Sequence, residues 1–454
     1  MESLDSKNKG CGKKGVIKVK DRLLEMMFEH ERWVDMINRA NEKHINLTIL
    51  KQLAKPDIRI ALYEAIKHEQ YEIMPPHQIE IPKDDGTMRL VYANEDQDRI
   101  ICTLINDCVM ELFSDMIHPS CVSYQKGKGT QEIVQRISKR IVQLDREKYG
   151  ETLGYVSDFT KFFDSVTIDK IDEIFDIWEK RLGFEYQTEP VINMLRKYYH
   201  STLYFDIDGN LQNKYLSLRQ GCAVAAALSC MVLYELDEYM SNHYEIYYRY
   251  SDDCCTVSEN IDNAIDDINS ICSKYGTRLN PKKIKPIYAN QWFKFLGFQI
   301  KNDMITLSKN RVKKFQKEIV SRTLSKPSIT YDQARRSVIN YLYKGNYCWA
   351  TSCLGTVNVI RDINEMNKFI MDCLRACKVR ETKKRKSKIS ISKIGGLGVV
   401  TNLPDRTILR GTGKNVSANK AKTGKVLTNY LTMGCLSNAM KINKSVYGAC
   451  VRAM

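Results

Sequence analysis

The sequence lacks the features that a membrane protein or a zinc protein needs. No apolar run in its 454 residues approaches the roughly 18 residues of a membrane-spanning helix. Residues 1–20 are polar and charged, so we expect no signal peptide. None of the fifteen cysteines forms a Cys-x-x-Cys pair, and only seven histidines are scattered along the chain. We therefore expect no zinc site and no appended zinc-dependent endonuclease, and we expect reduced core cysteines in a cytoplasmic protein.

The bulk composition describes a folded and strongly basic chain. Apolar residues make up 43% of the sequence, which excludes a largely disordered protein, and the length suffices for two or three domains. The formal net charge is +16. An excess of this size indicates a polyanionic partner, most simply nucleic acid, although a generally basic protein is the alternative.

Two adjacent carboxylates, Asp252 and Asp253, stand between two short apolar and aromatic runs. Ile246–Tyr250 precedes them, and Cys254–Val257 follows. This pattern predicts a strand, a tight acidic turn containing Ser251, and a second strand. Neighbouring carboxylates repel each other unless a cation lies between them, and Mg²⁺ is the usual partner of such oxygen clusters. A solvated acidic turn is the alternative.

A second acidic position matches the first. Leu153–Ser157 is typical of a short buried strand, and Asp158 follows it directly. An acid at a strand end beside an acidic hairpin is the layout that a two-metal site needs, where two ions clamp the attacking and leaving oxygens of a phosphoryl transfer. Asp158, Asp252 and Asp253 can hold both ions.

The order of these segments resembles the palm of reverse transcriptases. Asp158 matches the first palm motif, and Tyr250-Ser251-Asp252-Asp253 matches the Tyr-x-Asp-Asp motif. The resemblance runs from about residue 75 to about residue 300. Its other segments are Ile81–Arg89 (fingers hairpin), Tyr124–Thr130 (the glycine-containing segment of group II intron and retron enzymes), Arg219–Gly221 (second palm motif), Leu279–Lys283 (fourth motif) and Phe295–Phe298 (primer grip).

The resemblance implies an α+β right-hand polymerase, with fingers, a palm built on an antiparallel sheet with packed helices, a helical thumb and a C-terminal extension. The expected ranges are 1–70 for an N-terminal tail and helical region, 71–150 for fingers, 151–300 for palm, 301–377 for thumb and 378–454 for the basic extension. Within that extension, residues 378–393 carry eight basic residues and one acid. This stretch predicts a nucleic-acid-binding segment or a linker.

Apolar spacing adds local predictions. Residues 21–70 show helical periodicity, and a helix with a basic outer face is expected around Ile133, Ile137 and Ile141. The other expected elements are a hairpin with strands around Leu203–Asp206 and Leu211, a helix over Ala223–Met240 packed beneath the palm sheet, and a helix over Arg311–Arg322 with Val312, Phe315 and Ile319 inside and Lys313, Lys314 and Lys317 outside.

The resemblance also implies a role for each matched residue. Asp158, Asp252 and Asp253 would hold two Mg²⁺ or Mn²⁺ ions, with the backbone carbonyl of Phe159 as a further ligand. The implied substrate-binding residues are Lys83 and Arg89 on the nucleotide phosphates, Phe163 below the sugar as a deoxynucleotide gate, Gln220 and Gly221 beside the nascent base pair, and Lys283 as proton donor to pyrophosphate. Taken alone, each basic residue is equally compatible with a surface charge, and Phe163 with a core position.

The function implied is RNA-directed DNA polymerisation, with an RNA template, deoxynucleotides and a DNA product as partners. One departure bears on its biology, because Ala225 and Ala226 replace the Ser-Pro pair of intron and retron enzymes. This favours the diverse bacterial reverse transcriptases of antiphage defence, with a dedicated noncoding RNA as a possible template. Open alternatives are a template-independent or protein-primed nucleotidyltransferase, a mobile retroelement enzyme, an RNA-directed RNA polymerase and a silent scaffold. A homo-oligomer or a protein partner is compatible with each.

Overall fold

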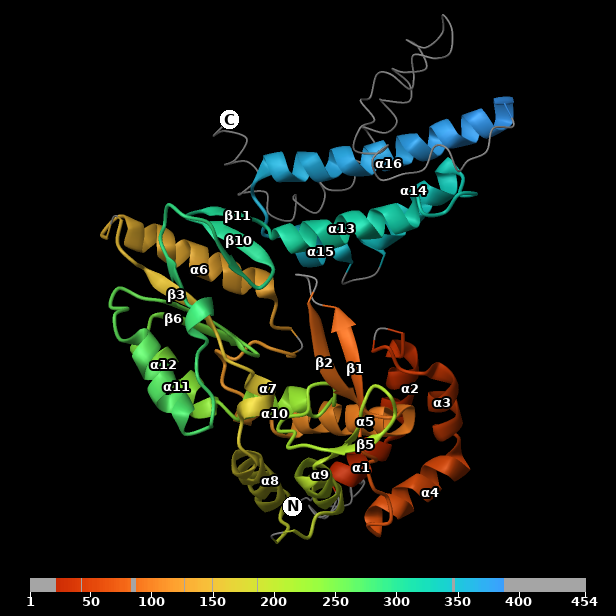
Figure 1. Cartoon of the computed structure of the whole chain (residues 1–454), viewed down its shortest axis with the longest axis vertical. Helices are drawn as coiled ribbons and strands as arrows, with labels where there is room; N and C mark the ends of the chain where they lie inside the picture. Colours follow the sequence, from red (N-terminus) through yellow and green to blue (C-terminus); the bar gives the residue numbers. More distant parts are fainter. Residues whose placement is uncertain are drawn as a thin grey trace, which may run out of the picture. The chain divides into compact units, whose positions relative to one another are not determined.

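The computed structural model describes the polypeptide between residues 22 and 387, apart from short gaps. The described ranges are 22–41, 43–82, 87–125, 127–148, 150–185, 187–344 and 348–387, with side chains up to residue 381. Sixteen α-helices and eleven β-strands in three sheets occupy these ranges (Figure 1), which confirms the expected mixed α+β fold. The predicted N-terminal tail and residues 388–454 of the predicted extension lie outside the described residues.

The chain divides into two compact units, each assembled from segments far apart in the sequence. Among the described residues, the first unit comprises those up to 119 together with 160–236 and 269–278, and the second comprises 120–159, 237–268 and those from 279 onward. The chain passes from the second unit to the first between Phe159 and Thr160, one residue after the predicted metal ligand Asp158. The division into fingers, palm and thumb ranges remains a prediction.

Helices build most of the first unit. The periodicity predicted for residues 21–70 is confirmed, because four helices occupy this stretch and bury their apolar residues. Helix α5 packs against α1, α3 and α10. The helices are α1 (Arg22–Phe28), α2 (His30–Arg39), α3 (Leu47–Leu53), α4 (Pro56–Lys67), α5 (Asp96–Leu112), α7 (Phe162–Ser165), α8 (Ile168–Leu182), α9 (Pro190–His200), α10 (Ala225–Met231) and the 3-10 helix η1 (Ser114–Met116).

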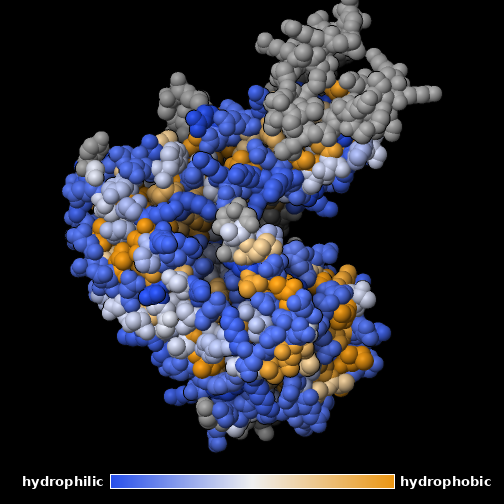
Figure 2. Space-filling view, in the orientation of Figure 1, coloured by the Kyte–Doolittle hydropathy of each residue, from blue (hydrophilic) through white to orange (hydrophobic). Residues whose placement is uncertain are grey.

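One four-stranded sheet belongs to the first unit, in the order β2-β1-β4-β5. Strands β1 (His77–Pro82) and β2 (Met88–Ala93) form the predicted hairpin, and β4 (Leu203–Phe205) and β5 (Leu211–Asn213) form the other predicted hairpin. The β1–β2 hairpin exposes four large apolar side chains, and hydrophobic residues gather over it in Figure 2. These side chains are Ile79, Ile81, Met88 and Leu90.

The prediction of one continuous helix over Ala223–Met240 is wrong. Two helices occupy this stretch, α10 (Ala225–Met231) and α11 (Tyr234–His243), and the helical bonding is interrupted around Val232 and Leu233. Both helices bury apolar side chains, and so do the two linking residues. Apolar spacing follows burial, so it does not distinguish an unbroken helix from one with a short interruption.

Two sheets belong to the second unit. The first has the order β6-β7-β3-β8 and is antiparallel throughout; its strands are β3 (Gly154–Asp158), β6 (Ile246–Tyr250), β7 (Asp253–Val257) and β8 (Lys285–Ile287). The second has the order β11-β10-β9, with β9 (Phe293–Phe295), β10 (Phe298–Lys301) and β11 (Met304–Leu307). Leu296 and Gly297 connect β9 to β10 with φ angles of 48° and 77°, the two positive values of a type I′ hairpin turn.

Most helices of the second unit share one apolar core with these sheets. Helix α6 packs on β10 and β11, while α13 and α14 run along α16, as Figure 1 shows. Helix α13 begins after Ser308, whose side chain accepts a hydrogen bond from the Arg311 N–H. The helices are α6 (Thr130–Asp145), α12 (Ala264–Ser273, partly in the first unit), α13 (Lys309–Arg322), α14 (Tyr331–Tyr343), α15 (Trp349–Leu354), α16 (Ile360–Ser387) and the 3-10 helix η2 (Pro281–Lys283).

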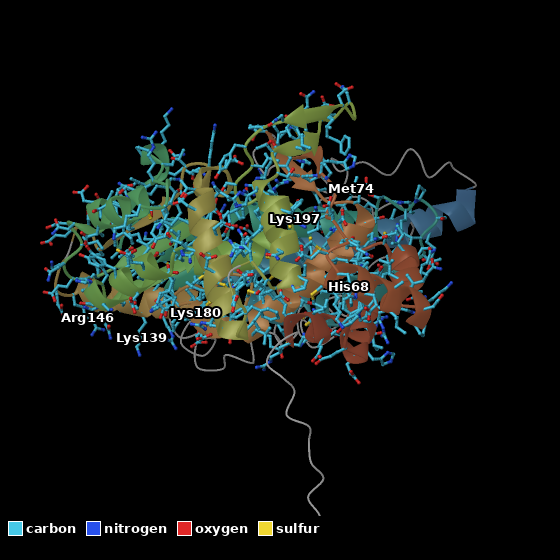
Figure 3. The ribbon with its side chains drawn as sticks, turned by 90° about the horizontal axis from the view of Figure 1, so that it is seen from below. His68, Met74, Lys139, Arg146, Lys180 and Lys197 are labelled. Atoms are coloured by element: carbon cyan, nitrogen blue, oxygen red, sulfur yellow. The ribbon has the colours of Figure 1, made fainter. Side chains whose placement is uncertain are left out.

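The two predicted amphipathic helices are confirmed. On α6, Ile133, Ile137 and Ile141 are buried, while Lys139 and the capping residue Arg146 are exposed, as Figure 3 shows. On α13, Phe315 and Ile319 are fully buried and Val312 is half-buried, whereas Lys313, Lys314 and Lys317 are exposed.

Two further expectations can be compared with the described residues. None of the helices described is both long enough and apolar enough to cross a membrane. The cysteines in this part of the chain are all buried except Cys353, as expected for core residues.

Candidate active site

Asp158 and Asp253 face each other across the two central strands of the second unit. Strands β3 and β7 are antiparallel, and their register places these two aspartates directly opposite at the end of the ladder. Side chains opposed in this way have Cβ atoms about 4.5–5.5 Å apart, and two like charges there are destabilising. Asp252 precedes β7 in the turn, and its carbonyl accepts a hydrogen bond of 3.2 Å from the Phe159 N–H. The predicted carboxylates therefore gather at the same end of the two central strands of one sheet, which is called the sheet edge below.

The electrostatics of this edge are visible at Asp253. The pKa of its carboxyl is raised from 3.8 to about 6, mainly by burial and in addition by the nearby charges of Asp252 and Asp158. Lys283 and Lys294 lower it in part. Near neutral pH, Asp253 is thus an anion that gains from a proton or a cation beside it.

Lys283 already supplies a positive charge at Asp158. Its ammonium nitrogen donates to both carboxylate oxygens at 2.7 Å. Asn280 holds the segment of Lys283 beside Asp158. The Asn280 N–H donates to the Asp158 carbonyl at 2.8 Å, and the Asn280 side chain caps η2 by accepting from the Lys282 N–H. The side chain of Lys283 is 53% exposed, so the ion pair itself adds little stability. The contact nevertheless brings the fourth-motif lysine to the first-motif aspartate, and the role of Lys283 as proton donor remains a prediction.

The donor chemistry of this edge fits a hard divalent ion. Its ligands would be carboxylate oxygens with a backbone carbonyl, which Mg²⁺ prefers, and the Lys283 ammonium stands in for a cation at Asp158. The side chains are not arranged around a common point, because no three His, Cys, Asp or Glu side chains among the described residues are placed to hold a metal ion. The residues therefore fit the ion by chemistry and by position on the sheet.

The turn between β6 and β7 is held by residues that the sequence analysis did not single out. Ser251 has a left-handed φ of 56°, which is costly for a residue other than glycine. Its N–H donates to the Ser123 hydroxyl at 2.8 Å, and its carbonyl accepts from Arg249 at 3.2 Å. Arg249 in turn forms a fully buried salt bridge with Asp237. The available sequence signal was a charged residue inside each of two apolar patterns, which predicts a buried partner.

In the first unit, the second-motif residues are tied to the β1–β2 hairpin. The Tyr92 N–H donates to the Gln220 carbonyl at 2.7 Å. Gly221 has a φ of 126°, and a Cβ at this position would lie 2.5 Å from the Tyr92 carbonyl oxygen. Glycine is thus required here by a close approach to strand β2. The contact of Gln220 and Gly221 with a base pair remains a prediction.

Arg89 and Phe163 also lie in the first unit. Arg89 is exposed on β2 opposite Ile81, whereas Lys83 is outside the described residues. Phe163 is half-buried on α7, with its ring centroid 5.4 Å from that of the buried Phe162. Because the segment is helical rather than extended, neighbouring rings point about 100° apart, and only Phe162 belongs to the core. Phe163 is therefore not a core residue, and its role as a sugar gate remains a prediction.

The predicted site residues thus form two sets, one in each unit. Asp158, Phe159, Asp252, Asp253 and Lys283 lie together in the second unit. The described members of the first unit's set are Arg89, Phe163, Gln220 and Gly221.

Comparison with known proteins adds a family to this geometry. Residues 81–300, a little under half of the chain, match the family described as "Reverse transcriptase (RNA-dependent DNA polymerase)". No curated protein matches the sequence.

Several solved structures align with most of this chain. Telomerase from Candida albicans in complex with a TWJ fragment of telomeric RNA has a TM-score of 0.42 and 10% identity, covering 83% of this chain and 62% of that chain. Apo telomerase from Candida tropicalis has a TM-score of 0.38 and 13% identity, covering 84% and 65%. An insertion-loop deletion mutant of the RNA-dependent RNA polymerase of a human picobirnavirus has a TM-score of 0.38 and 14% identity, covering 79% and 64%. This chain spans less than two thirds of the length of each.

Proposed function

We propose that this chain, whose residues 81–300 match the reverse transcriptase family, is an RNA-directed DNA polymerase that adds deoxynucleotides to a primer by two-metal phosphoryl transfer. The observation that carries the proposal is the pairing of Asp158 with Asp253 at one sheet edge, beside Asp252 in the turn. A nucleic-acid-binding scaffold has no need for clustered carboxylates that raise the pKa of Asp253 to about 6.

In the proposed mechanism, the carboxylates of Asp158, Asp252 and Asp253 would hold two divalent ions, with the carbonyl of Phe159 as a further ligand. When bound, such ions lower the pKa of the primer 3′-hydroxyl and neutralise charge on the triphosphate. The chain's own groups keep these oxygens at one sheet edge. The Lys283 ammonium, now on Asp158, is the proton donor to the leaving pyrophosphate.

The remaining roles concern the incoming nucleotide. Lys83 and Arg89 bind its β- and γ-phosphates, Arg89 by a bidentate fork. Phe163 excludes a 2′-hydroxyl by its bulk and selects deoxynucleotides. Gln220 and Gly221 lie beside the nascent base pair, with the backbone of Gly221 held against Tyr92.

Primer extension on purified protein tests the proposal. An RNA template with an annealed DNA primer, four deoxynucleotides and Mg²⁺ should yield extended DNA with the parent. The Asp252→Asn/Asp253→Asn double variant should yield none, while Asp262→Asn, which alters an exposed acid of the same unit, should match the parent. Extension by the double variant at the parental rate would refute the proposed mechanism.

Two further arms of this experiment distinguish the proposed polymerase from template-independent and protein-primed nucleotidyltransferases with the same palm. Products formed without an RNA template would identify a template-independent nucleotidyltransferase. Labelled nucleotide that stays on the protein after denaturing electrophoresis would identify priming from a side chain of the enzyme. Extension that requires both the template and the added primer supports the polymerase proposed here.

We further propose a bacterial defence role in the cytoplasm, in which synthesised DNA or its accumulation restricts phage. The support is that Ala225 and Ala226 stand where intron and retron enzymes carry Ser-Pro, and that the sequence shows no zinc-dependent endonuclease pattern. The basic stretch 378–393 would hold a dedicated RNA or the product, with binding that weakens steeply as salt rises. Phage plating on cells with the native locus, parent against Asp252→Asn, is the test. Equal plaque counts on a broad phage panel, together with copies of the locus at new genomic sites, would favour a mobile element.

A further inference from the structure

We propose that Arg249 and Asp237 are positioning residues of the metal site, which hold the turn that carries Asp252 and Asp253. The inference rests on the proposed function, because it assigns a purpose to the turn only if the two aspartates bind divalent ions. All the residues involved lie in the second unit.

The pair has the geometry of a rigid fork. The Nε and Nη2 atoms of Arg249 donate to the two carboxylate oxygens of Asp237 at 2.7 Å and 2.6 Å. Both side chains are completely buried. The Tyr247 hydroxyl adds a third donor to Asp237 at 3.1 Å. Since a bidentate, fully satisfied pair leaves the guanidinium little freedom, the direction of its third nitrogen is fixed as well.

That third nitrogen is directed at the turn. Nη1 of Arg249 donates to the carbonyl of Ser251 at 3.2 Å, one residue before the first aspartate of the hairpin. Ser251 is also held from its other side, because its N–H donates to the Ser123 hydroxyl. The turn is therefore clamped through both backbone groups of one residue.

The main chain of Arg249 secures the other side of the clamp. Its N–H donates to the Ser120 carbonyl and its own carbonyl accepts from the Val122 N–H, both at 2.9 Å. Cys121 thereby pairs with Arg249 as an isolated parallel bridge on strand β6. Ser123, which receives the Ser251 N–H, is placed by this pairing.

The energetics favour a positioning role over a purely stabilising one. A buried ion pair costs so much desolvation that an apolar pair of similar size is often equally stable or more stable. The turn, by contrast, needs restraint, because Ser251 has an unfavourable φ of 56° and the carboxylates beside it repel one another. Without the clamp, the turn could relax and move Asp252 and Asp253 apart.

The decisive variant removes both charges together. Asp237→Leu/Arg249→Met should melt near the parental temperature, because no unpaired charge remains buried. It should nevertheless require at least about tenfold more Mg²⁺ for half-maximal extension, and should bind Mn²⁺ at least about tenfold more weakly in the absence of nucleotide, as expected for residues that orient metal ligands. Electron paramagnetic resonance of free Mn²⁺ provides this second measurement on the purified protein.

A second variant covers the case in which the double variant does not fold. Arg249→Lys keeps the charge opposite Asp237 but cannot supply three directed nitrogens, so it should fold and show the same loss of Mn²⁺ affinity. The control is Arg196→Met, which breaks a different buried network with Asp172, Asp176 and Glu179 in the first unit. It should lower the melting temperature without changing Mn²⁺ affinity.

Parental Mn²⁺ affinity in a folded Asp237→Leu/Arg249→Met or Arg249→Lys variant would overturn the inference. Failure of the proposed function is a separate result, namely a parent that binds Mn²⁺ but extends no primer. In that case the Mn²⁺ comparison still decides whether Arg249 and Asp237 position the site.

Discussion

Lys283 and Asp158 are 125 residues apart in the sequence, yet the lysine ammonium donates to both oxygens of the aspartate at 2.7 Å. The contact joins the last residue of β3 to the last residue of η2, and it places the proposed proton donor at the first of the proposed metal ligands.

Replacement of Lys283 tests its role as proton donor. Lys283→Gln keeps hydrogen-bonding capacity but removes the titratable proton, so the rate of incorporation at saturating nucleotide should fall about 100-fold, within the range for general acids. Single-turnover extension at saturating nucleotide measures the rate. Lys282→Gln, which changes the neighbouring lysine, is the control, and a parental rate in Lys283→Gln would exclude proton donation.

The raised pKa of Asp253 predicts how the stability of the metal-free protein varies with pH. Between pH 3.8 and about 6 the folded state binds more protons than the unfolded chain at this group, so the free energy of unfolding falls as pH rises through this window. Asp253→Asn removes the effect. The variant should therefore be more stable than the parent at pH 7.5, by an amount on the order of 1–3 kcal/mol, and the difference should shrink toward pH 4.

Thermal melting in EDTA at several pH values checks this expectation. Added Mg²⁺ should raise the melting temperature of the parent more than that of Asp253→Asn, because only the parent keeps the full set of carboxylates. Asp262→Asn should show neither effect. A stability difference independent of pH would contradict the assignment of the raised pKa to Asp253.

Phe163 should determine which sugar is incorporated. Phe163→Val removes the ring proposed to exclude the 2′-hydroxyl, so the preference for deoxynucleotides over ribonucleotides should fall at least about tenfold, a difference of about 1.4 kcal/mol between the two transition states. Competing dNTP and rNTP incorporation measures the ratio. Phe162→Leu, which alters the adjacent core ring, should lower stability and leave the ratio unchanged. The same ratio in parent and Phe163→Val would move the gate elsewhere.

Gly221 should be intolerant of any side chain. In Gly221→Ala, the new Cβ would lie 2.5 Å from the Tyr92 carbonyl oxygen at a φ of 126°, so β2 or the second-motif loop must shift. We expect a loss of roughly 2–4 kcal/mol in the free energy of unfolding, as for other strained backbone positions. Urea denaturation measures it. Gly129→Ala is the matched control, because nothing lies within 4 Å of its added Cβ.

Local patterns in the sequence determined the secondary structure that positions the site. Alternation and turn residues predicted the hairpins around Asp252 and around Asp206–Asn210, and a period near 3.6 predicted α6 and α13. The order of short motifs indicated the family. These features depend on neighbours within a few residues, so the sequence carries them directly. The sequence assigned Asp158 and Asp253 to one site because local patterns predicted an acid at the end of one strand and an acidic turn before another.

Tertiary structure alone decided the partners that hold those residues. Arg249 pairs with Asp237, the Ser251 carbonyl accepts from Arg249, and Gly221 approaches Tyr92 from 129 residues away. Tertiary structure also decided the interruption between α10 and α11, since apolar side chains are buried on both sides of it. Each contact depends on which elements pack together, and pairwise packing is set by long-range shape and burial that no periodicity in a single sequence encodes.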